Sequence, residues 1–521
     1  MIRMNIDKKA LETGEGLMEY VKKIIYYQIF YKNVIGKDIK LVAAQLDMYD
    51  NKFVKDIFGY KNQKLNVEHN LVKPLCDNAT STFLGSVPDI VSNNKKESER
   101  ISKFTLKQKH NEFEEEIYDT ALKMSICGSG FCALYNEQGD NFPRYRSLNP
   151  KYTNVVYDCS IKMERLCAYH IYWDQYIDGG VYVCLIYTDK YIYAYKTSPM
   201  STSSRIVFSI YPLNLFLING ATYSYKSEHG FNGIPIVEFI NNKQCISDVK
   251  PALPQIGLYT ALQNNRFQNV DDIMNYLLFI KNARLGNEKE AEQAISLIKE
   301  HRVIALEGDN VDAKFLSNPL NQTDIQKLAD DYKNEIHYIT HIPDFTSVEF
   351  TQNASDPILK AKTKPLLDLC IEKEKWFNKG YMELLRLTLD FVKDNDKKLY
   401  DDVKFDLDNI DLVYTHTLPS NDTDMVNNIV NLGNQGLLNP EVALQSLSFI
   451  PNVNDYLVGA YRYNEYVDKR KENNNNKGNN GGTNDTNLER QNEKVVSKAQ
   501  QDNFKNFIKG KSQDISDNKA D

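Results

Sequence analysis

The sequence lacks the features of a membrane or secreted protein. It has no run of about twenty apolar residues, which is the length that a membrane-spanning helix needs. Its first ten residues are polar and charged, rather than a basic patch followed by an apolar stretch. We therefore expect neither a secretory signal nor a membrane span, and no membrane partner.

Disulfide and nucleotide-binding patterns are absent as well. The eight cysteines form no CxxC pair and show no disulfide-like spacing, which predicts reduced, partly buried thiols in a cytosolic protein. They are Cys76, Cys127, Cys132, Cys159, Cys167, Cys184, Cys245 and Cys370. No GxxxxGK(S/T) string occurs, and no GxGxxG string follows a predicted strand, so no phosphate-binding loop is predicted.

The chain also lacks an excess of basic residues. The chain has 63 Lys and Arg against 70 Asp and Glu, a net charge of −7. A protein that coats nucleic acid would need a large basic surface to bind the phosphates. The balance therefore argues against tight nucleic-acid binding, but it is compatible with DNA that slides past the protein.

The first half of the chain predicts helices followed by a β-rich region. At 521 residues and 42% hydrophobic content, several subdomains are expected. Apolar residues recur every three or four positions over 38–58 and 111–124, which predicts two amphipathic helices. From about 130 to 240, short β-branched and tyrosine-rich runs alternate with turn sequences, which predicts antiparallel strands.

The middle of the chain predicts two long helices around a compact insert. Spacing of three and four predicts a helix over 254–281, roughly 40 Å long at 1.5 Å per residue. The insert predicts a helix at 288–300 and short strands at 302–306 and 313–316, before a second helix over 324–341. The polar segment 345–355 has no periodicity and predicts a loop.

The last part begins with a helix start. Asp356 and Pro357 predict an N-cap followed by a first-turn proline, and helical spacing continues to about Val392. Pro365 lies too deep for the first turn and predicts a kink. Residues 403–418 predict strands that return to the β-rich region, 421–470 predict short helices, and the Asn-rich tail from Lys471 predicts disorder.

This order of elements resembles the portal proteins of tailed bacteriophages, especially long-tailed phages of Gram-positive bacteria, over roughly residues 38–470. The most specific part runs from the first long helix through the turn 342–345 to the string NASDPILK at 353–360. A second part is CGSGFCALY at 127–135, followed by Leu148, Asn149 and Pro150. The family often has Ser-Gly where this chain has Ser355-Asp356.

The resemblance implies an α+β portal fold with a β-rich wing, a long-helix stem, a small α/β clip, a kinked tunnel helix and an α-helical crown. The implied parts are an N-terminal segment 1–37, wing 38–245, stem helix 246–282, clip 283–320, second stem helix 321–342, tunnel loop 343–356, tunnel helix 357–393, returning wing strands 394–419, crown 420–470 and disordered tail 471–521.

The resemblance also implies a function without catalysis or cofactors. A homo-oligomeric, dodecameric ring would form the channel at one capsid vertex for DNA packaging, retention and ejection. Implied partners are double-stranded DNA, the terminase large subunit, a head-tail adaptor, scaffold and the major capsid protein. The implied location is the portal vertex of the virion, with the host cytoplasm during assembly.

The resemblance places the tunnel-loop residues in the DNA channel, without metal ligands among them. These are Thr346, Ser347, Glu349, Phe350, Gln352, Asn353 and Ser355. Lys360, Lys362 and Lys364 could present a basic ring to DNA, or form an ordinary solvated helix start with ion pairs to Glu349 or Asp356. Lys360 and Lys364 share one helix face, and Lys362 does not.

Other patterns allow a second class of function. His337 and His341 have a metal-binding spacing, and an acidic cluster could suggest a metal-dependent phage nuclease: Asp401, Asp402, Asp406, Asp408 and Asp411. The alternative interpretations are ordinary surface histidines and a half-exposed strand, since the aspartates alternate with Val403, Phe405 and Leu407. Another minor head protein is a third hypothesis.

Two further patterns have a structural and a functional interpretation. Gly128-Ser129-Gly130 could cradle a phosphate, but we favour a structural turn. A group of tyrosines could stack nucleic-acid bases, but at alternating strand positions we favour packing on a sheet. They are Tyr182, Tyr187, Tyr191, Tyr193 and Tyr195.

Overall fold

A computed structural model describes most of the chain between residues 69 and 416. The described residues are 2–3, 39–50, 69–92, 94–137, 139–158, 160–175, 180–202, 205–212, 215–218, 221–224, 226–274, 277–281, 312–316, 322–351, 356–416, 418, 429 and 431. The chain divides into two units, Met1–Pro343 with Pro365–Thr417, and Asp344–Lys364 with Leu418–Asp521. The predicted insert helix 288–300, strand 302–306 and tail lie outside the described residues, as does the predicted crown apart from two single positions.

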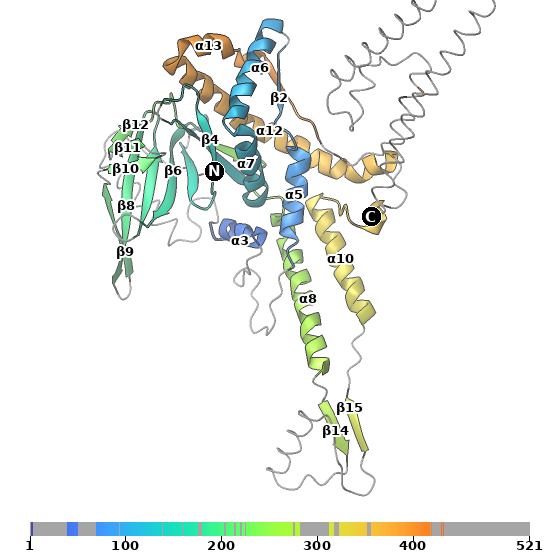
Figure 1. Cartoon of the computed structure of the whole chain (residues 1–521). Helices are drawn as coiled ribbons and strands as arrows, with labels where there is room; N and C mark the ends of the chain where they lie inside the picture. Colours follow the sequence, from blue (N-terminus) through green and yellow to red (C-terminus); the bar gives the residue numbers. More distant parts are fainter. Residues whose placement is uncertain are drawn as a thin grey trace, which may run out of the picture. The chain divides into compact units, whose positions relative to one another are not determined.

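The β-rich region predicted over 130–240 is confirmed in the first unit (Figure 1). Its largest sheet has the order β1-β5-β6-β7-β8-β12, with β9 also paired to β8. The pairs are antiparallel except β1 with β5. Its strands are β1 (Ile2–Arg3), β5 (Thr153–Tyr157), β6 (Arg165–Asp174), β7 (Val181–Tyr187), β8 (Tyr191–Thr202), β9 (Arg205–Pro212) and β12 (Lys226–Glu228).

Smaller antiparallel sheets complete this region. Strands β13 (Ile236–Ile240), β3 (Ser129–Tyr135) and β4 (Arg144–Leu148) form one sheet in that order. Strands β10 (Leu215–Ile218) and β11 (Ala221–Ser224) pair separately. The predicted strands at the end of the chain are only partly present, since β16 (Ile410–Val413) pairs with β2 (Asp89–Ser92) and not with the large sheet.

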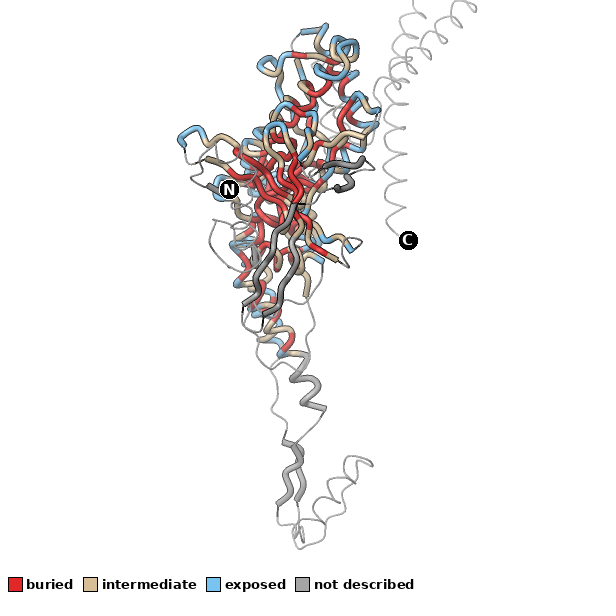
Figure 2. Tube along the Cα trace, turned by 90° about the vertical axis from the view of Figure 1, so that its left-hand side faces the viewer, coloured by how far each residue is buried: buried red, intermediate tan, exposed pale blue. Residues whose placement is uncertain are grey.

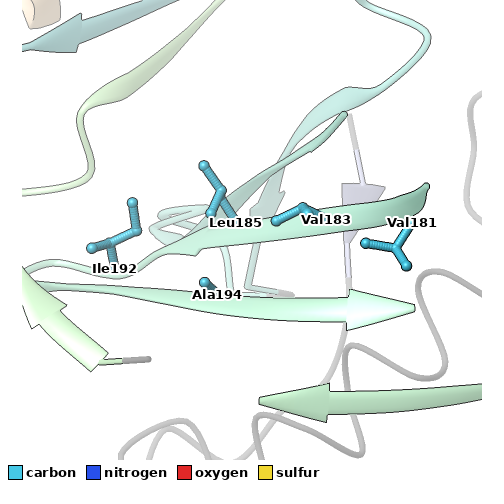
Figure 3. Packing of buried hydrophobic residues seen from close by; sticks show 5 residues of the cluster. All are labelled: Val181, Val183, Leu185, Ile192 and Ala194. Carbon is cyan, nitrogen blue, oxygen red and sulfur yellow. The ribbon is translucent and has the colours of Figure 1, made fainter. Parts of the chain in front are cut away.

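The large sheet buries side chains on both faces. Val181, Val183 and Leu185 of β7 pack with Ile192 and Ala194 of β8 (Figure 3). Successive residues of a strand point to opposite faces, so the buried Tyr193 and Tyr195 lie on the other face of β8. These two tyrosines confirm the packing interpretation, and Figure 2 shows buried residues gathered where strands and neighbouring helices meet.

Helices cover this region and join it to the rest of the first unit. They are α3 (Ile39–Tyr49), α5 (Val72–Phe83), α6 (Lys95–His110), α7 (Phe113–Cys127), α12 (Asp356–Asn395) and α13 (Lys397–Val403). Helix α7 confirms the prediction at 111–124 and packs on β3 and β4. Helix α3 confirms the start of the predicted helix 38–58, whose last part lies outside the described residues. No described helix has the length and apolar content of a membrane span.

The two long helices of the middle region pack side by side (Figure 1). They are α8 (Leu253–Met274) and α10 (Gln322–Thr340), and the Arg266 guanidinium donates to Gln326 Oε1 at 2.6 Å. The prediction of helix to Lys281 was wrong, because Leu277–Lys281 forms β14, which pairs antiparallel with β15 (Asp312–Leu316). A short run of consecutive apolar residues fits a strand as well as a helix, and pairing with β15 decides between them.

Helix α12 confirms the long helix that was predicted over 357–393. It extends from Asp356 to Asn395 with Pro365 inside it. Its part in the first unit is deeply buried: Phe377, Leu384 and Leu385 are 0% exposed. The kink predicted at Pro365 falls where the two units join and stays a prediction.

Candidate functional site

The segment 344–364 begins with a turn that is closed by Asp344. The Thr346 backbone N–H and hydroxyl both donate to Asp344 Oδ1, at 3.0 and 2.6 Å. The Ser347 hydroxyl donates to the Asp344 carbonyl at 2.9 Å and accepts the Phe350 backbone N–H at 3.1 Å. Ser347 therefore acts as the N-cap of the helical turn that follows, and its side chain is already engaged within the segment.

The loop predicted over 345–355 contains one helical turn, α11 (Val348–Thr351). Phe350 is 8% exposed and meets Phe345 edge to face, with ring centroids 5.1 Å apart. The prediction that the whole segment lacks regular structure was therefore wrong, because an N-cap and an aromatic pair fix this turn. Gln352, Asn353 and Ser355 lie outside the described residues, and so does the side chain of Glu349.

The three candidate lysines stand on the first two turns of α12. Lys360 and Lys364 are exposed, whereas Lys362 is half-buried. The Lys362 ammonium donates to the Phe350 carbonyl at 3.4 Å and lies 5.6 Å from the centre of the Phe350 ring. Lys360 and Lys364 were predicted to share one helix face without Lys362, and this is confirmed. The first two are exposed, whereas Lys362 contacts Phe350 of α11.

The charge of the segment 344–364 differs from that of the whole chain. It has three acidic residues, Asp344, Glu349 and Asp356, and three lysines, so its formal net charge is zero against −7 for the chain. A neutral, polar segment neither repels a duplex strongly nor neutralises many phosphates. This balance suits transient contact with a nucleic-acid backbone better than tight binding.

A buried polar cluster, missed by the sequence analysis, holds α12 further along. Lys373 is 1% exposed, and its ammonium pairs with Asp248 and donates to Ser125 Oγ at 3.2 Å. Asn241 Nδ2 donates to the other Asp248 oxygen, Oδ1, at 2.7 Å. The cluster ties α12 to the end of α7 and to the residues just before α8. The periodicity of α12 did not reveal this cluster, because lysine is usually exposed and is buried only where it is paired. The acidic partner, Asp248, is remote in sequence.

The candidate metal-binding patterns do not come together. The His337 ring donates from Nδ1 to the Ile342 carbonyl at 2.8 Å, and His341 is exposed with φ of 61° after the end of α10. Across the described ranges between 2 and 431, no group of three or more His, Cys, Asp or Glu could hold a metal ion.

The half-exposed-strand interpretation of the aspartates was largely wrong. Asp401 and Asp402 belong to α13, where Asp401 pairs with Lys404 and Asp402 lies 3.6 Å from Lys103. Asp406 caps the 3-10 turn η2 (Leu407–Asn409), which contains Asp408, by accepting the Asp408 backbone N–H at 3.1 Å. Of the five, Asp411 lies on a strand, β16. Asp401 and Asp402 therefore serve surface pairs and Asp406 a cap, on separate elements.

The Gly128-Ser129-Gly130 string has a structural role, as the sequence analysis favoured. Gly128 ends α7 with φ of 85°, and its backbone N–H donates to the Met124 carbonyl. A Cβ at Gly128 would lie 2.3 Å from the Cys245 carbonyl oxygen, and one at Gly130 would lie 2.2 Å from the Thr120 carbonyl oxygen. The glycines therefore allow close packing of backbone on backbone, and Ser129 and Gly130 pair with β13.

The cysteines fit the predicted buried thiols. The seven that the structure describes form no disulfide, and six of them are buried. Burial raises the pKa of the Cys132 and Cys370 thiols to about 12. These two thiols therefore stay protonated near neutral pH and are poor nucleophiles.

A known protein family matches most of the chain. Its model, described as "Phage portal protein, SPP1 Gp6-like", covers residues 26–478. The chain belongs to this portal family. The resemblance seen in the sequence is confirmed, and so is a mixed fold of helices and sheets.

Two relatives of the chain are each named portal protein. The one from Bacillus phage SPP1 is 20% identical over 406 residues, 75% of this chain and 74% of the relative. The one from Clostridium phage phiCD119 is 23% identical over 265 residues, 48% of this chain and 54% of the relative. A solved structure, described as the neck of a native GTA particle computed with C12 symmetry, has a TM-score of 0.39 and 11% identity, and covers 73% of this chain and 90% of that one.

Proposed function

We propose that the protein is a non-enzymatic portal subunit that assembles with further copies into a dodecameric ring at one vertex of a phage capsid. DNA passes through the ring during packaging and ejection. The match to the portal family over residues 26–478 is the observation that carries this proposal. The terminase large subunit, a head-tail adaptor, scaffold and the major capsid protein are the proposed partners, in the host cytoplasm during assembly and then in the virion.

The parts of the fold have proposed roles in this ring. The β-rich region with its helices is the wing, α8 and α10 are the stem, and β14 with β15 belongs to the clip. The segment 344–364 is the tunnel loop with the start of the tunnel helix. Paired long helices and a capped polar turn support this assignment, because a channel needs walls that pack side by side and a narrow point that contacts DNA weakly.

The segment 344–364 would touch DNA through exposed polar groups and not through a strong electrostatic grip. Thr346 is exposed on it, as are Lys360 and Lys364. The net charge of zero limits counterion release on contact, so binding is weak and reversible. Weak contacts to the backbone carry no base readout, which suits a duplex of any sequence that must slide.

Deleting residues 347–353 tests this role. We expect the deletion to leave ring assembly intact, as seen in end-on electron micrographs, and to reduce the yield of DNA-filled heads. A matched control is Val348→Ala, which keeps the backbone of α11 and should package normally. A normal yield of filled heads from the deletion would contradict the role of the segment, and a purified wild-type chain that stays monomeric would contradict the portal function itself.

A further inference from the structure

An apolar groove with an acidic rim lies beside α6 and α7 of the first unit. It has a volume of about 1120 Å³ and is lined by residues that include Leu106, Phe113 and Tyr381. Leu106 is 68% exposed, which is unusual for a leucine on an amphipathic helix. Exposed apolar surface with a polar rim is typical of an interaction site between proteins.

The rim of this groove is negatively charged. Its charged lining residues are Asp89, Glu114, Glu115 and Lys109, so three carboxylates stand against one ammonium group. Lys109 lies 3.6 Å from Glu114, both well exposed. An occupant with an apolar side chain and a neighbouring positive charge would match both the wall and the rim.

The turn between β5 and β6, residues 160–164, carries such a pair of side chains. Ile161 is fully exposed, at 106%, and the neighbouring Lys162 side chain is 81% exposed. Lys162 lies 2.9 Å from Glu164, but an ion pair this exposed contributes little and is readily exchanged. The turn therefore offers an isoleucine beside a lysine at its tip.

The backbone of this turn is held in place by hydrogen bonds. The Asp158 backbone N–H donates to the Glu164 carbonyl at 2.9 Å, and the Glu164 backbone N–H donates to Asp158 Oδ1 at 2.9 Å. The Met163 backbone N–H closes the turn onto the Ser160 carbonyl at 3.2 Å. A fixed turn loses little entropy when it docks, so Ile161 is presented as a rigid projection.

The turn and the groove lie on opposite sides of α12. Arg165, which directly follows the turn, pairs with Glu383 of α12, whereas Tyr381 of α12 lines the groove. Residues two apart on an α-helix are rotated by about 200° around the helix axis, so they point to nearly opposite sides. The turn of one subunit therefore cannot fill its own groove, but it can reach the groove of a neighbour. Matching surfaces on opposite sides of a subunit can repeat head to tail, which is the kind of interface that a ring requires.

We propose that Ile161 and Lys162 of one subunit insert into the Leu106 groove of the next, with Lys162 meeting Glu114 and Glu115, as a joint of the ring. This inference rests on the proposed portal function and names the partner as a second copy of this chain. Ile161 removes apolar surface of the groove from water, and Lys162 sets the register through charge.

Cysteine cross-linking of the full chain tests the joint. Rings of the Leu106→Cys/Ile161→Cys double variant should give, on mild oxidation, a ladder of linked subunits on a non-reducing gel. A disulfide requires Cα atoms about 4.4–6.8 Å apart, so it reports direct contact. An equal mixture of the two single variants should give products no larger than dimers. The control variant Ile161→Cys/Lys243→Cys, which pairs the turn with an exposed lysine outside the groove, should give no ladder.

Charge reversal gives a second test that does not depend on oxidation. Lys162→Glu and Glu115→Lys should each raise the protein concentration for half assembly about tenfold at low salt, and the two together should restore it. Rings of normal size without a ladder, or without rescue, would overturn this joint and leave the portal function standing. Failure of the wild-type chain to form rings would overturn both.

Discussion

Lys373 and Lys360 lie on the same helix, α12, yet Lys373 is buried against Asp248 and Ser125 while Lys360 is exposed. In the first unit, the Lys373 ammonium is enclosed and paired with the Asp248 carboxylate. In the segment 344–364, the polar groups close a local turn and leave Lys360 and Lys364 at the surface. Lysine therefore has two roles on α12: Lys373 holds the helix to the interior through a buried ion pair, and Lys360 lies at the surface. Burial distinguishes the two roles.

The largest expected effect on stability is that of replacing the buried Lys373. Lys373→Ala leaves Asp248 as an uncompensated buried charge, so the free energy of unfolding should fall by about 3–5 kcal/mol, measured by urea denaturation. Lys375→Ala, at an exposed position on the same helix, should change it by no more than about 0.5 kcal/mol. Equal losses from the two variants would break the comparison.

Removing both charges refines this result. In Lys373→Met/Asp248→Leu, no unpaired charge remains, so the loss should be clearly smaller than in Lys373→Ala. A double variant as unstable as the single one would mean that the hydrogen bonds to Ser125 and Asn241, and not the charge balance, hold this part of α12.

The next effect concerns pH. Burial lowers the pKa of His170 from 6.5 to about 4, and its Nδ1 lies 2.8 Å from Thr153 Oγ1. Between pH 6.5 and pH 4 the unfolded chain binds the proton more readily than the folded chain does. Stability from this residue is therefore complete at pH 7 and is lost as the pH falls, by about 3 kcal/mol in all.

Urea unfolding at pH 7 and at pH 4.5 measures this loss. His170→Gln should remove most of the His170 share of the pH dependence, whereas the exposed control His110→Gln should retain it. An unchanged slope in the His170 variant would show that this buried side chain is not what makes the first unit acid-sensitive.

A smaller effect belongs to the segment 344–364. Phe350→Ala removes the edge-to-face contact with Phe345, an interaction of about 1 kcal/mol. Backbone amides of α11 should then exchange with solvent about fivefold faster, while the urea midpoint of the chain stays the same. Val348→Ala, at a residue that is 65% exposed, should leave exchange unchanged. A shift of the urea midpoint would show that the turn supports the whole fold.

The sequence predicted the elements whose periodicity is strong and local. Helices α7, α10 and α12 and the strands β3, β5, β6, β7 and β8 were found because their buried residues recur at helical or strand spacing. Helix α6 was missed because its sequence is mostly polar, with Ile101 and Phe104 as its buried apolar residues. Helix α5 was missed because Asn, Thr and Ser favour other conformations, and burial of Leu75, Ala79 and Phe83 overrides that preference.

The candidate site was less predictable than the fold. The lysine faces follow from helical spacing, so Lys360, Lys362 and Lys364 were divided correctly. The Asp344 turn and the contact of Phe345 with Phe350 join residues only a few positions apart. The sequence around them is polar and aperiodic, so it predicted a loop and gave no sign of these contacts. The bond from Lys373 to Asp248 joins residues 125 positions apart, and no local pattern encodes it.

The smallest expected effect is on the salt dependence of DNA binding. It distinguishes the exposed Lys360 and Lys364 from the half-buried Lys362. Each lysine that neutralises a phosphate steepens the dependence of DNA binding on the logarithm of salt concentration by about 0.9. The Lys360→Ala/Lys364→Ala variant should therefore flatten the salt dependence of DNA retention in filled heads, because both side chains face solvent. Lys362→Ala should change it less, since its ammonium is held by the Phe350 carbonyl. If Lys362→Ala flattens the salt dependence as much as the double variant does, then the contact with Phe350 is given up when DNA is present, and α11 must move away from α12 as the duplex passes.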